Sequence, residues 1–226
     1  MKPGQQTILG VPVPQGRFFG PCSGQDLPLA FLLFGNTVDR FTFCDLSYRG
    51  QRITAKTAVP RSWTLISRVQ AHDEMAVEKI AVYSGNRTFR PRVTFEIWRR
   101  SDASEVLVEL RCDLAQDVLI DQFAAGSIAA FMHINDGSGE GGSDLWFLSR
   151  PSETRGDSHR QNELLPETLS RLCDGCIVVT DGVLAAPEFR SDAVFELEGR
   201  RWERMSLFSN DRRADRPIGI WRCLVK

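Results

Sequence analysis

Two glycines in a short turn, and an aspartate about twenty residues further on, are the residues whose types and spacing best fit ligand binding. Residues 18–26, FFGPCSGQD, follow a short apolar run and precede the apolar stretch 27–34, so they predict a turn between a strand and a helix. Glycines let a ligand approach the backbone there, and amides at the helix start can donate to it. The candidates for cofactor binding in this turn are Gly20, Cys22, Gly24 and Asp26. The alternative is a plain strand-to-helix turn.

Asp45 supplies the acid of this candidate site. Residues 39–48, DRFTFCDLSY, are rich in aromatic and β-branched types and predict a second strand that ends near Asp45. A carboxylate at the end of a second parallel strand can accept hydrogen bonds from both hydroxyls of a ribose. Glycine turn and acid together indicate a ligand site more strongly than either does alone.

A second candidate site follows the predicted strand 127–134. The segment 133–147, HINDGSGEGGSDLWF, is too rich in glycine to pack in a core and predicts a loop. Its carboxylates can face a cation or a substrate amine, with the histidine as a base at the strand end. The catalytic candidates are His133, Asn135, Asp136 and Glu140. The alternative is a flexible loop whose acids face water, preceded by a histidine that is hydrogen-bonded at the end of its strand.

The elements that must position these residues alternate between helix and strand. We expect helices at 27–34, 54–81, 117–123 and 162–172, and strands at 17–20, 127–134 and 176–180. Period-two alternation in 93–98 and 106–110 predicts a β-hairpin inserted at 92–111. The loop between the tail strands 202–208 and 218–225 is too short for a crossover helix, so the last strand should be antiparallel. These elements predict an α/β fold, with an open, doubly wound, mostly parallel sheet. It forms a single domain over 1–226, with an extended lead-in at 1–15.

A glycine turn after the first strand, an acid ending the second strand and an antiparallel last strand occur here in the order found in one large enzyme family. Over residues 16–226 the chain resembles the class I S-adenosylmethionine-dependent methyltransferases. The resemblance implies a Rossmann-like fold, S-adenosylmethionine as cofactor and methyl transfer to an acceptor that the sequence does not identify. It also implies that Asp45 binds the ribose, that Asp113 lies near the adenine, and that the loop after residue 134 holds catalytic or substrate-binding residues.

The glycine turn departs from the pattern of that family. Phe18 stands where an acid is common, and Pro21, Cys22 and Ser23 interrupt the glycines. A non-catalytic binding or accessory protein on a methyltransferase-like scaffold is therefore the alternative function. A nicotinamide-dependent oxidoreductase is disfavoured, because the turn lacks the GxGxxG pattern.

Composition narrows the partners. The chain carries 28 basic and 29 acidic residues, so no net field attracts it to nucleic acid or to an anionic membrane. The partner that the resemblance implies is the small-molecule cofactor. An N-terminal apolar run of signal-peptide length and a membrane-spanning run are both absent from the sequence, which predicts a cytoplasmic protein without membrane contact. Six cysteines are too few for a disulfide framework in 226 residues, and Cys173 and Cys176 form a single CxxC pair, so we expect reduced, packed thiols and no metal.

Overall fold

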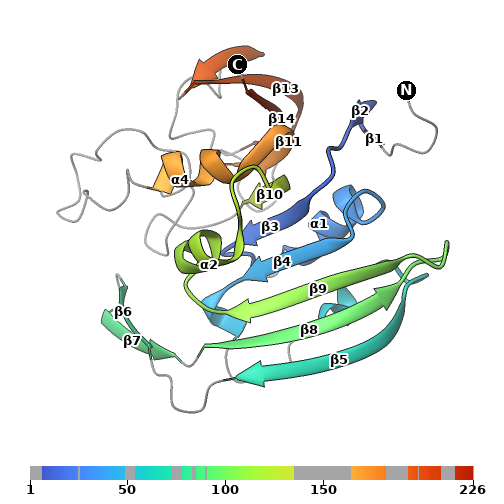
Figure 1. Cartoon of the computed structure of the whole chain (residues 1–226), viewed down its shortest axis with the longest axis vertical. Helices are drawn as coiled ribbons and strands as arrows, with labels where there is room; N and C mark the ends of the chain where they lie inside the picture. The colour runs from blue at the N-terminus through green and yellow to red at the C-terminus, as the bar shows by residue number, and fades with distance from the viewer. Residues whose placement is uncertain are drawn as a thin grey trace.

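One ten-stranded mixed sheet is the centre of the structure (Figure 1). A computed structural model describes residues 7–24, 26–48, 54–72, 78–82, 85–89, 91–134, 164–181, 193–197, 199–209 and 217–225. The strand order is β12-β13-β14-β11-β10-β3-β4-β9-β8-β5. Two small antiparallel pairs, β1–β2 and β6–β7, stand apart from this sheet. Their bounds are β1 (Thr7–Ile8), β2 (Val11–Pro12), β6 (Glu78–Val82) and β7 (Gly85–Phe89).

Five neighbouring strands in the middle of the sheet are parallel. They are β3 (Arg17–Pro21), β4 (Arg40–Cys44), β9 (Glu105–Cys112), β10 (Ile128–His133) and β11 (Leu172–Thr180). From β3 the chain continues to β4, which lies on one side of β3. Strand β10 lies on the other side of β3, and the chain reaches it from β9. The strand order therefore changes direction between β3 and β10.

Antiparallel strands extend the sheet at both sides. Beyond β9 lie β8 (Arg92–Arg99) and β5 (Thr64–His72), and β8 and β9 are joined by a tight turn at Arg100–Ser104. Beyond β11 lie β14 (Ile218–Val225), β13 (Arg200–Phe208) and β12 (Val194–Leu197). The connection from β4 to its parallel neighbour β9 therefore runs through two further strands of the same sheet.

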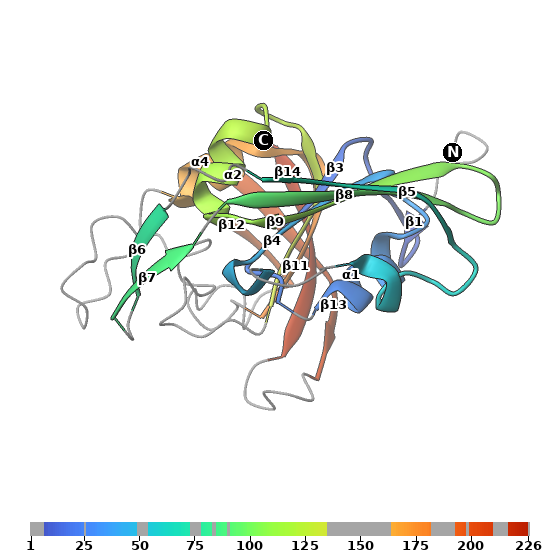
Figure 2. The same ribbon diagram turned by 90° about the horizontal axis from the view of Figure 1, so that it is seen from below.

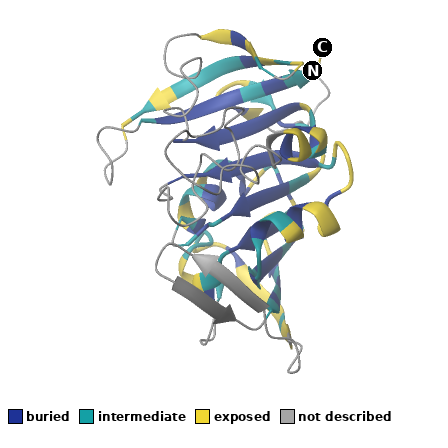
Figure 3. Ribbon diagram, turned by 90° about the vertical axis from the view of Figure 1, so that its left-hand side faces the viewer, coloured by how far each residue is buried: buried dark blue, intermediate teal, exposed yellow. Residues whose placement is uncertain are grey.

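Short helices cover the two faces of the parallel strands (Figure 2). Helix α1 (Leu27–Phe34) lies on one face, and α2 (Ala115–Gln122) and α4 (Leu164–Arg171) lie on the other. Alternation along β4 matches this arrangement, because Phe41 and Phe43 join the core on the α1 side while Cys44 joins the core on the α2 side. Figure 3 shows the result as a band of buried strands through the middle of the sheet. No helix of the described residues is long and apolar enough to cross a membrane.

The prediction of a doubly wound α/β fold is wrong, and so is the resemblance to the Rossmann-like methyltransferase fold. The described residues form a predominantly β structure with a ten-stranded mixed sheet and three α-helices of eight residues each. Residues 54–81 differ most from the prediction, because β5 and part of β6 stand in place of the predicted helix. Strands replace the helix that would cross from β4 to β9, and antiparallel strands widen the sheet at both sides.

Candidate functional site

The carboxyl ends of the five parallel strands meet at one edge of the sheet. The pairing aligns Pro21 with Cys44 and Cys44 with Arg111, and it aligns His133 with Thr180. Neighbouring strands lie about 4.8 Å apart, so this carboxyl edge is about 19 Å wide. Side chains and loops next to the change in strand order between β3 and β10 are well placed to surround a ligand, because the two crossovers leave that point in opposite directions.

The turn that follows β3 is held tightly against β4. The Ser23 amide donates to the Cys44 carbonyl at 3.1 Å, and the Ser23 hydroxyl donates to the Gly20 carbonyl. A Cβ atom at Gly20 would lie 2.9 Å from Ser23 Oγ and 3.0 Å from a Phe18 ring carbon, so any larger residue would have to displace these side chains. Cys22 and Gly24 have φ of 50° and 45°. A left-handed backbone at a non-glycine residue is uncommon and is held by its surroundings.

Asp45 binds two backbone amides at the end of β4. Its Oδ2 accepts from the Gly24 amide and its Oδ1 from the Ser47 amide, each at 2.7 Å. The Tyr48 hydroxyl donates to the Gly24 carbonyl at 3.1 Å, which closes a ring of contacts around the turn. Burial, and then the nearby Asp45 carboxylate, raises the pKa of Tyr48 well above its ordinary value. The carboxylate of Asp45 is therefore fixed in place while its residue stays partly exposed.

Polar residues also end β10 and β11, on the other side of β3. His133 pairs with Thr180 in the parallel ladder, and Asp181 follows directly. Each of the three residues has an exposed fraction of only 1%. Sequence reasoning proposed His133 but did not assign a role to Thr180 or Asp181. Polar residues at the end of the β-branched run 176–180 were the signal that could have found them, since buried polar groups in a core need specific partners.

Asp113 lies just beyond β9, beside a polar cavity of about 270 Å³ between this strand end and α2. Arg111, Asp117, Asp121 and Gln122 line the same cavity. The Asp113 carbonyl accepts a hydrogen bond from the Cys44 thiol at 3.0 Å. Burial, then Asp113 and Asp45, raises the pKa of Cys44 well above its ordinary value, so this thiol stays protonated. It ties the ends of β4 and β9 together.

The structure thus brings most of the predicted site residues to one edge. Gly20 lies near the end of β3, Cys22 and Gly24 lie in the turn that follows, and Asp26 lies at the start of α1. Asp45, Asp113 and His133 follow or end neighbouring strands. The other three catalytic candidates, Asn135, Asp136 and Glu140, lie outside the described residues.

Phe18 belongs to the core and not to this edge. Its ring is fully buried, with centroids 5.5 Å from Phe34, 5.2 Å from Phe41 and 5.1 Å from Phe43. An acid at this position of β3 would stand unpaired among three aromatic rings, which explains why the chain lacks one there.

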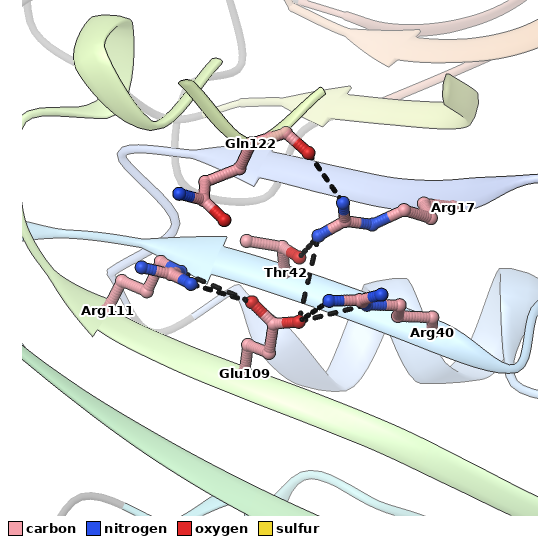
Figure 4. A network of polar contacts seen from close by, with 6 residues as sticks. All are labelled: Arg17, Arg40, Thr42, Glu109, Arg111 and Gln122. Carbon is pink, nitrogen blue, oxygen red and sulfur yellow. Dashed lines mark hydrogen bonds and ion pairs between the residues drawn. The ribbon is translucent and has the colours of Figure 1, made fainter. Parts of the chain in front are cut away.

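A second polar cluster, which the sequence did not indicate, lies on the α2 side of the sheet (Figure 4). The fully buried Glu109 accepts from Arg40 Nε and Nη2 at 2.9 and 2.6 Å on one oxygen, and from Arg111 Nε and Nη2 at 3.2 and 3.1 Å on the other. Arg17 Nη2 lies 3.6 Å from Glu109 and donates to Thr42 at 3.0 Å, and Arg17 Nη1 donates to the Gln122 carbonyl at 2.6 Å. Three arginines from β3, β4 and β9 thus share one carboxylate.

The cysteines are packed thiols. Cys176 lies opposite Cys223 in the β11–β14 ladder, and burial raises the pKa of Cys176 well above its ordinary value and that of Cys223 to about 12. Burial and Asp174 raise the pKa of Cys173 to about 11. Thiols with such pKa values are poor nucleophiles at neutral pH. No group of three metal-ligating side chains is found among the described residues.

Comparison with known proteins adds no family. No protein-family model and no curated protein matches the chain significantly.

Proposed function

We propose that the chain binds a small molecule with neighbouring hydroxyl groups, such as a ribonucleoside, at the carboxyl edge over β3, β4 and β10. The observation that carries this proposal is the position of Asp45. Its carboxylate is held by the Gly24 and Ser47 amides at the carboxyl end of a parallel strand, one strand away from the point where the strand order changes direction. Ligands of open parallel sheets bind at such points.

The two amides leave Asp45 able to bind a ligand. An ionised carboxylate has about four acceptor positions, and the backbone amides use two of them. The remaining two, one on each oxygen, suit a pair of adjacent hydroxyl groups. Since the amides already fix the side chain, little rotamer entropy is lost when a ligand binds.

The turn after β3 and the carboxyl ends of β10 and β11 support the same site. The turn carries no side chain at Gly24, where an added Cβ would have only Asp45 Oδ2, 3.7 Å away, within 4 Å, so a ligand can lie against its backbone there. His133, Thr180 and Asp181 place polar side chains across the change in strand order from this turn. The edge is about 19 Å wide, which is enough for a nucleoside that carries a further polar group.

S-adenosylmethionine is the first ligand to test, because it carries a ribose and a charged amino-acid group. The proposal concerns binding. Methyl transfer from this ligand remains a prediction from the sequence, and three of its four candidate catalytic residues lie outside the described part of the chain.

Calorimetric titration with S-adenosylmethionine, S-adenosylhomocysteine, adenosine and 2′,3′-dideoxyadenosine tests the proposal. We expect the ribose compounds to bind and the dideoxy compound to bind more weakly. Asp45→Asn should reduce the affinity for the ribose compounds by about 1 to 3 kcal/mol and remove the preference for the diol. A purely structural role of Asp45 would leave that preference unchanged.

Asp102→Asn is the matched control. Asp102 Oδ1 accepts the Ser104 amide at 2.9 Å, in the same i to i+2 arrangement as Asp45 and Ser47, but it lies in the β8–β9 turn at the amino end of β9. This control should bind like the wild type. No binding of any ribose compound, or equal binding of the two adenosines, would contradict the proposal.

A further inference from the structure

The edge strand β5 is long and open. It has nine residues, Thr64–His72, and ends the sheet beyond β8, with no further strand paired to it within the described residues (Figure 1). The opposite edge strand, β12, has four residues. An open edge presents unpaired amides and carbonyls, which another strand can satisfy.

Apolar side chains are exposed along β5. Leu65, Ile66 and Val69 are 39%, 43% and 61% exposed, and they are three of the nine large apolar side chains that are exposed among the described residues. Edge strands usually avoid unwanted pairing through lysine, proline or charge. The segment contains no lysine, proline or acid, and its one arginine, Arg68, lies 3.5 Å from Glu96 of β8. A bulge between Leu65 and Ser67 leaves the stretch 67–72 in regular register with β8.

A second copy of the same strand fits this edge in a defined register. Every second residue of β5 turns its amide and carbonyl toward the open edge. In an antiparallel pair of identical strands these outward-facing residues must lie opposite one another. The two-fold axis therefore passes through one residue, and not between two residues. Centring on Arg68 would place two like charges opposite each other, which is unfavourable, and centring on Gln70 would place Arg68 opposite His72, a second basic residue. Centring on Val69 places the two valines opposite each other, Arg68 opposite Gln70 of the second copy, and Ser67 opposite Ala71.

We propose that the chain forms a two-fold symmetric homodimer in which the β5 strands of two copies pair antiparallel, centred on Val69. The two sheets then continue into each other and the exposed valine becomes buried. Such an interface is self-complementary, as two-fold symmetry requires. It lies two strands beyond β9 and so leaves the carboxyl ends of β3, β4 and β10 open.

Sedimentation equilibrium of the full chain and four variants tests the dimer and its register. We expect a reversible monomer–dimer equilibrium for the wild type. Val69→Lys places two ammonium groups opposite each other in place of two valines and should weaken the dimer at least about tenfold. Val194→Lys makes the same change at the other edge of the sheet, where the valine is 51% exposed, and should leave the dimer intact.

Two substitutions of Gln70 should change the dimer affinity in opposite directions. Gln70→Glu would place a carboxylate opposite Arg68 of the second copy twice per dimer, and should tighten the dimer about two- to thirtyfold. Gln70→Lys should weaken it by a similar factor. We expect each variant to fold, since the substituted residues are exposed, and circular dichroism checks this.

A wild-type chain that remains monomeric up to millimolar concentration would overturn the proposal. A dimer that Val69→Lys leaves intact, or that Gln70→Glu and Gln70→Lys change in the same direction, would overturn the assignment to β5 or its register.

Discussion

The buried carboxylate of Glu109 accepts two hydrogen bonds from Arg40, at 2.9 Å from Nε and 2.6 Å from Nη2. It also accepts two from Arg111, and Arg17 lies within 3.6 Å, so three cations surround one anion. Burial and then the neighbouring Arg40 lower the pKa of Arg17, while Glu109 opposes this shift. Glu109 therefore stabilises the joined β3, β4 and β9 strands mainly by compensating the arginines that face it.

Glu109→Gln should lower the free energy of unfolding by about 3 to 5 kcal/mol, because it leaves three arginines without a buried counter-charge. Urea unfolding followed by circular dichroism measures the change. Glu105→Gln is the control on the same strand. Its partner Arg99 lies 3.3 Å away and both side chains are about half exposed, so the loss should be below about 1 kcal/mol. Equal losses for the two variants would contradict the role given to Glu109.

Gly20→Ala tests how tightly the end of β3 is packed against the turn that follows it. The new methyl group would meet Ser23 Oγ, Phe18 and Phe43 within 3.2 Å, and we expect a loss of about 1 to 3 kcal/mol in stability together with weaker ligand binding. Gly126→Ala is the control, since no atom lies within 4 Å of its added Cβ and its cost comes only from a φ of 66°. Thermal unfolding and calorimetry separate the two. Unchanged ligand binding in Gly20→Ala would move the ligand away from this turn.

Phe18→Ala should cost about 3 to 5 kcal/mol, because the ring is fully buried among three other phenylalanines. Leu32→Ala, on the exposed side of α1, should change stability by less than about 0.5 kcal/mol. Denaturant midpoints of the two variants provide the comparison. A small effect of Phe18→Ala would contradict the place of this ring in the core.

Stability should fall in alkali, and Tyr48 should contribute to the fall. Its pKa is raised in the folded chain above the ordinary value of 10.0, so the unfolded chain releases this proton first. The stabilisation is complete below about pH 10 and is lost as the pH rises from there toward the folded-state pKa. Tyr48→Phe should be less stable at neutral pH by about 1 kcal/mol, through loss of the hydrogen bond to Gly24, but should lose less stability above pH 10. Urea unfolding at pH 7, 9 and 10.5 checks this. Parallel pH curves for the two proteins would contradict the assignment.

Local patterns predicted the elements that carry the candidate site. The apolar stretch after the glycine turn forms α1, and the run at 127–134 contains β10, because the apolar residues of each segment match the positions that are buried in the fold. Residues 54–81 misled the prediction. Trp63, Ile66 and Val69 have helical spacing, but β5 is an edge strand with both faces largely exposed, so it lacks the alternation by which strands are recognised.

By itself, the sequence determined the turn with Gly20 and Gly24, the acid at the end of β4 and the buried runs of the central strands. These features depend on backbone geometry and local burial, which residue types control directly. Only the tertiary structure decided that β3 lies between β4 and β10, that Asp45 binds the Gly24 amide, and that Glu109 compensates arginines from three strands. The reason is that strand order and side-chain pairing depend on contacts between residues far apart in the chain, and no local pattern specifies which strands become neighbours.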